Sequence, residues 1–250
     1  CKECGYPTCL AFAMKLAAKQ AELSACKYVS EESQAKLSAA AAPPIRLITL
    51  SADGRLVKAG NETVLFRHEK TFFNPTGIFV RVPDNLAAAD VSELVRTVAE
   101  YKVDYVGMAL RLDGVAVESV AGDAASFAAA VAAARAAATI PMMLVSENPA
   151  VIEAGLAEMA GSVPLLCAAT EANWEAMAAL AKAAKAPLVV RAETLDGLAE
   201  LTGKLVAAGV EDLVLDPAAR GFGPSLDAVT QLRRLALKKN FKPLGYPIVT

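Results

Sequence analysis

The 250-residue sequence is poor in several features, and each shortage excludes a class of protein. Its net charge is −2 and it has no basic run, so it lacks a surface that would bind nucleic acid. Its most apolar stretch, residues 124–146, is broken by Arg135 and Pro141, which excludes a membrane span. No G-x-G-x-x-G motif follows a predicted strand, so dinucleotide binding is not favoured.

Alanine supplies much of the 55% hydrophobic content, whereas aromatic residues make up only 6%. This composition indicates closely packed helices around a sizeable core. The length allows one large domain and a small one. The chain begins at a cysteine rather than at Met, so we expect its natural N-terminus to lie further upstream. No signal peptide is visible, and we expect a reducing cytoplasm, where free thiolates persist.

Four of the five cysteines, Cys1, Cys4, Cys9 and Cys26, lie in the first 26 residues. Thiolate quartets hold either an iron–sulfur cluster or a structural zinc ion. Zinc sites usually have two C-x-x-C pairs, and only one is present here. The spacing also differs from two common ferredoxin spacings. A cluster is the favoured interpretation and zinc the second. Disulfides are least favoured, because nothing else is typical of a secreted protein.

The long gap before Cys26 is compatible with one shared site. Residues Thr8–Ala18 are predicted to form a helix with Thr8 as its N-cap, and that helix rises by about 16 Å. The extended stretch Lys19–Cys26 reaches about 23 Å, enough to return to the first three cysteines. Gly5 allows the backbone to approach a cluster closely.

The chain after the cysteines is predicted to form a separate domain. A short polar helix at Tyr28–Ala39 leads into a linker, Ala39–Pro44, that ends in two prolines. We therefore predict a cluster domain at residues 1–40 and a second domain at residues 41–250. The short strands predicted to open the second domain are Ile45–Leu50, Leu56–Val57 and Thr63–Phe66.

Apolar runs then alternate with helical patterns, which predicts an α/β protein with a parallel sheet covered by helices. The number of repeats favours a β/α barrel of the TIM type. The predicted strands are Ile78–Val82, Tyr105–Leu110, Met142–Val145, Pro164–Leu166, Leu188–Val190, Asp212–Leu215 and Tyr246–Val249. The predicted helices are Val91–Tyr101, Ala124–Ala138, Pro149–Ala160, Glu171–Ala184, Leu195–Ala208 and Ser225–Asn240. A complete barrel has eight strands, so we expect a barrel truncated after the seventh.

Polar residues at the strand ends are candidates for a site, because barrel chemistry collects there. They are Arg111, Glu147, Asn148, Asn173, Arg191, Asp216 and Arg220, with Gly221 and Gly223 in a flexible loop. Asp216 with Asn173 would imitate the site of pterin-dependent methyltransferases, which are similar barrels. The plainer interpretation is that these residues cap helices and form a docking surface. Cys167 is expected to be a buried core thiol, Trp174 a packing residue and His68 a structural or surface residue.

The cysteine segment and three later stretches resemble one family. C-x2-C-G-x-P-T-C-L-A-F-A, with a fourth cysteine in C-K-Y-V-S, looks like the cluster domain of the corrinoid iron–sulfur protein large subunit, the gamma subunit of acetyl-CoA decarbonylase/synthase. The resemblance continues through Asn61–Phe72, Asp212–Pro217 and Arg233–Ile248. It implies a [4Fe-4S] cluster carried by Cys1, Cys4, Cys9 and Cys26.

The resemblance also implies a function, that of a methyl-group carrier of the reductive acetyl-CoA pathway, grouped with methyltransferases. A corrinoid cobalt accepts methyl from a methyl-pterin and delivers it to acetyl-CoA synthase, and the cluster reactivates Co(II) to Co(I). The corrinoid is expected to bind a C-terminal domain that is absent from this chain. The implied partners are a small corrinoid-protein barrel subunit in a heterodimer, a methyl-pterin methyltransferase and acetyl-CoA synthase.

We identify no catalytic acid, base or nucleophile in this chain, because metal and corrinoid carry the chemistry in such a protein. One alternative is a pterin-dependent methyltransferase barrel with a fused electron-transfer cluster domain. Another is an electron-transfer module whose barrel is inert.

Overall fold

The structure is a computed structural model that describes residues 3–17, 21, 23–30, 33, 43–52, 54–66 and 68–250. The chain divides into two compact units, Cys1–Ala42 and Pro43–Thr250. Most of the helix predicted at Tyr28–Ala39, and the first four residues of the predicted linker, lie outside the described residues.

The first unit contains one α-helix, α1 (Cys9–Ala17), and a short 3-10 helix, η1 (Leu23–Ala25), among its described residues. Thr8 is the N-cap of α1, as predicted, because its side-chain oxygen accepts a hydrogen bond from the backbone N–H of Ala11 at 3.1 Å. Phe12 is the buried residue of α1, and its ring lies 5.5 Å from that of Tyr6.

The second unit opens with an antiparallel hairpin of β1 (Ile48–Ala52) and β2 (Arg55–Ala59). Strand β1 begins three residues later than predicted. The short strand predicted at Thr63–Phe66 is wrong, because that segment is irregular in the structure.

Six parallel strands form the main sheet in the order β10-β9-β8-β7-β6-β3, so that each strand pairs with its neighbour in this series. They are β3 (Phe79–Pro83), β6 (Gly114–Glu118), β7 (Met142–Val145), β8 (Leu165–Ala169), β9 (Leu188–Arg191) and β10 (Leu213–Asp216). The predicted seventh strand exists only as a single parallel bridge between Ile248 and Leu215. The Leu215 N–H donates to the Pro247 oxygen at 2.8 Å, and the Val249 N–H donates to the Leu215 oxygen at 2.9 Å.

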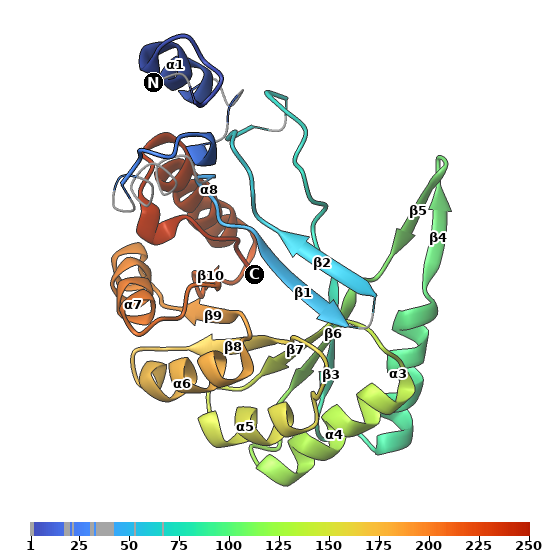
Figure 1. The fold of residues 1–250 in the computed structure, drawn as a ribbon. Helices are drawn as coiled ribbons and strands as arrows, with labels where there is room; N and C mark the ends of the chain where they lie inside the picture. Colours follow the sequence, from blue (N-terminus) through green and yellow to red (C-terminus); the bar gives the residue numbers. More distant parts are fainter. Residues whose placement is uncertain are drawn as a thin grey trace. The chain divides into compact units, whose positions relative to one another are not determined.

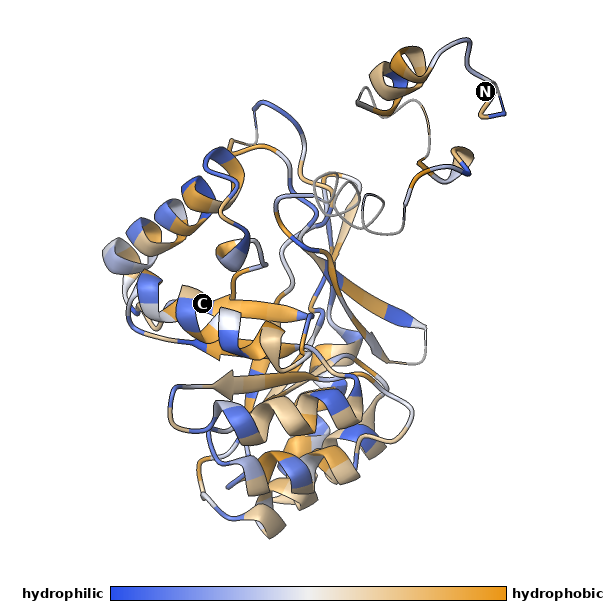
Figure 2. Ribbon diagram, turned by 60° about the vertical axis from the view of Figure 1, so that its left-hand side comes forward, coloured by the Kyte–Doolittle hydropathy of each residue, from blue (hydrophilic) through white to orange (hydrophobic). Residues whose placement is uncertain are grey.

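Helices cover one face of this sheet and the β1–β2 hairpin lies on the other (Figure 1). The helices are α3 (Ala88–Glu100), α4 (Ala124–Ala137), α5 (Pro149–Ala157), α6 (Trp174–Ala184), α7 (Leu195–Ala207) and α8 (Phe222–Lys238), followed by a short 3-10 helix, η2 (Lys242–Leu244). In Figure 2 the strands of the sheet are mostly hydrophobic, whereas hydrophilic residues interrupt the helices.

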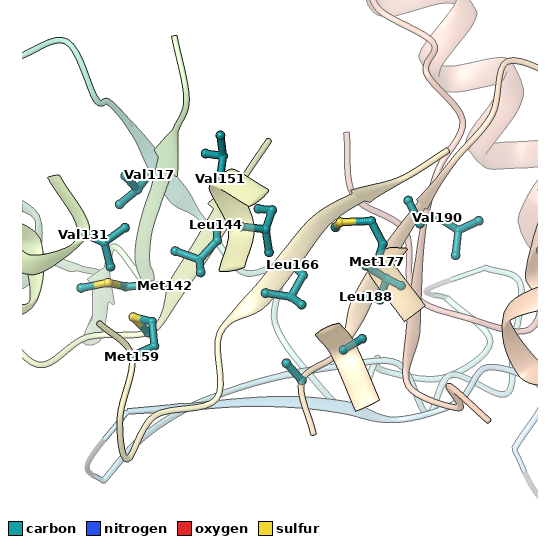
Figure 3. Close-up of a cluster of buried hydrophobic side chains, with 14 of the residues drawn as sticks. Val117, Val131, Met142, Leu144, Val151, Met159, Leu166, Met177, Leu188 and Val190 are labelled. Atoms are coloured by element: carbon teal, nitrogen blue, oxygen red, sulfur yellow. The ribbon is translucent and has the colours of Figure 1, made fainter. Parts of the chain in front are cut away.

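The core between sheet and helices follows from the alternation of side chains along each strand. Alternate strand residues such as Leu144, Leu166 and Val190 point to the helices, where they meet Val131 and Met177 (Figure 3). The residues between them point to the opposite face of the sheet, which the β1–β2 hairpin covers. Met143, Leu165, Val189 and Val214 form a second cluster with Ile48 and Leu50 of β1.

The second predicted strand, Tyr105–Leu110, is wrong. Its residues belong to a separate hairpin of β4 (Lys102–Tyr105) and β5 (Met108–Arg111), and the sheet position is taken by β6. Val106 and Gly107 both have positive φ angles, 53° and 77°, so they make a two-residue hairpin turn inside the apolar run. Buried Gly114 begins β6, where a Cβ atom would lie 2.1 Å from the Pro141 oxygen.

No helix among the described residues is long and apolar enough to cross a membrane.

Candidate metal centre and the mouth of the barrel

Three of the four clustered cysteines, Cys4, Cys9 and Cys26, are described, and all three are free thiols. Cys9 is exposed, and the other two are partly exposed. Cys9 is the first residue of α1, where the helix dipole favours a negatively charged ligand such as a thiolate. The fourth predicted ligand, Cys1, lies outside the described residues.

The neighbours of Cys4 and Cys26 are in contact although they are far apart in sequence. The Tyr28 hydroxyl donates a hydrogen bond to the Glu3 carboxylate at 3.0 Å, and the Lys27 ammonium lies 3.9 Å from the same carboxylate. Both charged side chains are largely exposed, so we assign little stability to the ion pair. These contacts nevertheless bring the residues just after Cys26 next to Glu3, the residue just before Cys4.

The donor chemistry of this segment fits an iron–sulfur cluster. Thiolate sulfur is the ligand such clusters require. Gly5 has a φ angle of 80° and no atom within 4 Å of a hypothetical Cβ, so the backbone beside Cys4 leaves room for a bulky group. Among the residues that the structure describes, no three Cys, His, Asp or Glu side chains gather closely enough to hold a metal ion. The ligand set of Cys1, Cys4, Cys9 and Cys26 therefore stays a prediction.

At the carboxyl ends of the strands, four charged residues predicted for the rim form one network. The Arg191 guanidinium lies between two carboxylates, with Nε 2.8 Å from Asp216 Oδ2 and Nη1 2.7 Å from Glu147 Oε1. Arg220 binds Asp216 through both oxygens, at 3.0 and 2.9 Å. We call Glu147, Arg191, Asp216 and Arg220 the rim network.

Asp216 is the buried centre of the rim network, with 3% of its side chain exposed. Its Oδ1 also accepts a hydrogen bond from the Ala218 N–H at 2.8 Å. Burial opposes ionisation, but the hydrogen bonds from Arg220 and Arg191 outweigh it and hold the pKa of Asp216 below its ordinary value. Asp216 is therefore a paired structural carboxylate.

Cys167 lies beneath the rim network, with Sγ 3.8 Å from Arg191 Nη2. It is buried, as predicted for a core thiol. Burial raises the pKa of Cys167 to about 11, and the charge of Arg191 offsets that effect only in part. The thiol is therefore protonated near neutral pH and is a poor nucleophile.

Iodoacetamide is expected to leave Cys167 unmodified in the folded protein at pH 8 and to modify it after unfolding in urea. A pKa about two units above the ordinary value lowers the thiolate fraction about a hundredfold, and burial blocks access as well. Mass spectrometry of peptides from native and unfolded protein measures this. In metal-free protein the partly exposed Cys4 and Cys26 serve as reactive references. Rapid modification of Cys167 in native protein would contradict its buried position.

Asn173 does not join Asp216 in a shared site. Its amide nitrogen donates to the backbone oxygens of Glu147 at 2.7 Å and Ala168 at 3.2 Å. Its side-chain oxygen accepts from the Thr170 N–H at 2.7 Å. Both side chains proposed for a pterin site are thus engaged within the protein.

The remaining predicted residues have structural positions. Asn148 caps α5 through the Ala150 N–H at 3.0 Å. Trp174 packs against the core, as predicted. His68 is exposed and stacks on Phe66 with ring centroids 5.5 Å apart, which confirms the surface prediction.

Two predicted positions were wrong. Arg111 lies at the end of β5 in the hairpin, because the strand expected there is not part of the sheet. Gly223 lies inside α8 rather than in a flexible loop, because the helix begins earlier than predicted.

Sequence reasoning also missed charged groups on β3 and β6. Arg81 pairs with Glu118, and both fall on the inward alternation of their strands. Asp84 is buried and accepts from the backbone N–H groups of Val120 at 2.8 Å and Ala121 at 2.9 Å. Side chains two residues apart on a strand point to the same face of the sheet. Arg81 lies two residues after Phe79, which packs in the cluster beneath the β1–β2 hairpin, and this spacing could have identified Arg81.

An apolar cavity of about 310 Å³ lies between the β1–β2 hairpin and the inner face of the sheet. Ile48 and Leu50 line it together with Phe79 of β3 and Val249 near the C-terminus. Val214 of β10 also lines the cavity, so both edge strands of the sheet, β3 and β10, border it.

Consecutive parallel strands with outer helices, and charged residues at their carboxyl ends, define an α/β protein with an incomplete TIM-type barrel. The same fold occurs in dihydropteroate synthase from Thermus thermophilus, with a TM-score of 0.50 at 19% identity over 80% of this chain and 75% of that one. At this identity the likeness concerns the fold alone.

Residues 47–250 match the family described as CO dehydrogenase/acetyl-CoA synthase delta subunit, and the chain belongs to that family. A second family model, of an Fe-S cluster, matches residues 1–28. The chain is 46% identical over 249 residues to the corrinoid/iron-sulfur protein large subunit of Moorella thermoacetica. It is 39% identical over 259 residues to the acetyl-CoA decarbonylase/synthase complex subunit gamma 2 of Methanosarcina mazei.

These matches cover 100% of this chain but 56% and 55% of the two relatives, so the chain spans about half of their length. They confirm the resemblance to the corrinoid iron–sulfur protein large subunit.

Proposed function

We propose that this chain is the cluster-bearing and barrel part of a methyl-group carrier in the acetyl-CoA pathway. The identity of 46% to a corrinoid/iron-sulfur protein large subunit along the whole chain carries the proposal. The proposal assigns the cluster domain to residues 1–40 and the barrel to residues 41–250. In the complete protein, a C-terminal domain would hold the corrinoid, and an eighth strand would close the barrel.

Four thiolates, from Cys1, Cys4, Cys9 and Cys26, would hold a [4Fe-4S] cluster. When bound, this group supplies single electrons that return Co(II) corrinoid to the Co(I) state, which accepts methyl from a methyl-pterin. The chain's own residues position it: the N-terminus of α1 orients Cys9, and the Glu3–Tyr28 hydrogen bond keeps Cys26 near Cys4. The proposal places the protein in the cytoplasm, because free thiolates persist in a reducing compartment.

The barrel would serve as scaffold and docking surface for the partners. These are a small corrinoid-protein subunit, a methyl-pterin methyltransferase and acetyl-CoA synthase. The paired state of Asp216 and the protonated thiol of Cys167 support a barrel without a general base or nucleophile of its own. The engaged side chain of Asn173 argues against the pterin-dependent methyltransferase alternative.

Protein prepared without oxygen is expected to contain about four irons and four labile sulfides per chain, with little zinc. Four thiolates and no histidine form the ligand set of such a cluster, and a reducing preparation preserves it. Iron, zinc and acid-labile sulfide analysis measures the content. Stoichiometric zinc without sulfide in freshly isolated protein would refute the cluster and favour a structural zinc site.

A further inference from the structure

The β4–β5 hairpin is an exposed ribbon with one apolar face. Strand pairing places Val103 opposite Leu110 and Tyr105 opposite Met108, so these four side chains lie on the same face. Their exposures are 40%, 48%, 62% and 59%. The ribbon projects from the end of α3, away from the sheet and its helices (Figure 1).

An isolated two-stranded ribbon is only marginally stable in water. Here all eight strand residues are exposed, and both outer strand edges lack a partner strand among the described residues. Exposed apolar surface with free strand edges favours association. The apolar face of the ribbon therefore fits a surface that is covered in an assembly.

The opposite face of the ribbon carries two cations, Lys102 and Arg111, and one carboxylate, Asp104, so its net charge is positive. Lys102 and Arg111 pair directly across the two strands, and like charges in that position destabilise the hairpin. The structure describes no ion pair for either cation. The nearby Asp104 accepts a hydrogen bond from the Gly107 N–H at 3.1 Å and so stabilises the turn. A partner that supplies carboxylates would relieve this repulsion.

A second copy of the chain fits this requirement poorly. A second copy set ribbon against ribbon would bring two more cations, and its Asp104 carboxylate is already engaged by the Gly107 N–H at the turn. The charge pattern therefore favours a different surface, with an apolar groove and acidic side chains at its border.

We propose that the β4–β5 hairpin is a docking arm for a different protein subunit, one that offers an apolar groove bordered by carboxylates. The inference rests on the proposed function, in which this partner is the small subunit of the complex. The arm inserts Tyr105 and Met108 into the groove and sets Lys102 and Arg111 against its acidic border.

The test measures binding of the full-length chain to the separately purified small subunit by titration calorimetry and stopped-flow kinetics. Tyr105→Thr/Met108→Thr is expected to raise the Kd about thirtyfold or more, because two buried anchors are lost while strand propensity is kept. Lys102→Glu/Arg111→Glu is expected to lower the association rate about tenfold at low salt, with a smaller effect at high salt. Ala109→Ser, on the polar face, is the matched control and should bind as the parent protein does.

The outcomes separate the two proposals. If the parent protein binds the small subunit and both double variants bind equally well, the docking arm is refuted while the proposed function stands. If the parent protein does not bind the small subunit, the proposed assembly fails. If the parent protein forms dimers in sedimentation experiments that only Tyr105→Thr/Met108→Thr abolishes, the occupant is a second copy and the inference is overturned. Unchanged melting temperatures show that the variants fold.

Discussion

Cys26→Ser in the complete protein is expected to abolish recovery of Co(II) protein by a physiological electron donor, while sparing methyl transfer from cobalt that has been reduced chemically. The predicted ligands belong to a unit of their own, Cys1–Ala42. A site that held the reacting methyl group would need placement within fractions of an ångström. A one-electron donor tolerates looser placement, so loss of the fourth thiolate should remove only the electron supply.

The measurement compares methyl transfer rates of chemically reduced protein with spectroscopic recovery of the Co(I) state after oxidation. Cys167→Ser is the matched control, because it changes the one cysteine outside the predicted ligand set and should leave iron content and recovery intact. Loss of methyl transfer in fully reduced, folded Cys26→Ser protein would contradict the assignment of the cluster as an electron donor.

Asp216→Asn is expected to lower the free energy of unfolding by about 3 kcal/mol at pH 7, because it leaves Arg191 and Arg220 without their shared, buried counter-charge. Urea denaturation followed by circular dichroism measures the change. Asp196→Asn, an exposed carboxylate on α7, is the control and should change stability by about 0.5 kcal/mol or less.

The pH dependence of this effect has a definite sign. The pKa of Asp216 is lower in the folded protein than its ordinary value, so the unfolded chain binds the proton more readily. Its contribution to stability is fully present above the unfolded pKa of about 4 and is lost as the pH falls through the folded pKa. The parent protein and Asp216→Asn should therefore converge in stability in acid. A difference that stays constant down to pH 2 would indicate a packing defect rather than a lost charge interaction.

Apolar runs identified most of the fold because the buried parallel strands are continuous in β-branched and other apolar residues. The strands around Leu144, Leu166, Val190 and Leu215 lie where the sequence predicted them. Tyr105–Leu110 gave the same signal although it is exposed. The turn residues Val106 and Gly107 join the apolar ends of β4 and β5 into one continuous run, which resembles a buried strand in the sequence.

The candidate sites were predictable to different degrees. The cysteine segment is local, so its spacing indicated a thiolate metal centre, and the resemblance to a family pointed to an iron–sulfur cluster. The rim residues were identified by their position after each strand, but their partners depend on strand register. Arg191 meets Asp216 because β9 and β10 pair them directly, and this register cannot be derived from single strands. The hydrogen bonds of the Asn173 side chain to the backbone of Thr170 and Glu147 are equally specific to the folded loop.

The strand order also bears on how the chain folds during synthesis. Each strand of the main sheet pairs with the strand just before it in the series, and the inward-packing hairpin with Ile48 and Leu50 is made first. Each new strand and helix can therefore dock on structure that has already left the ribosome. Such stepwise growth needs few contacts between residues that are far apart in the sequence. The fold is thus suited to assembly from the N-terminus onward. At each stage the newest strand exposes unpaired backbone groups along its edge, and that edge is where a nascent chain most needs protection.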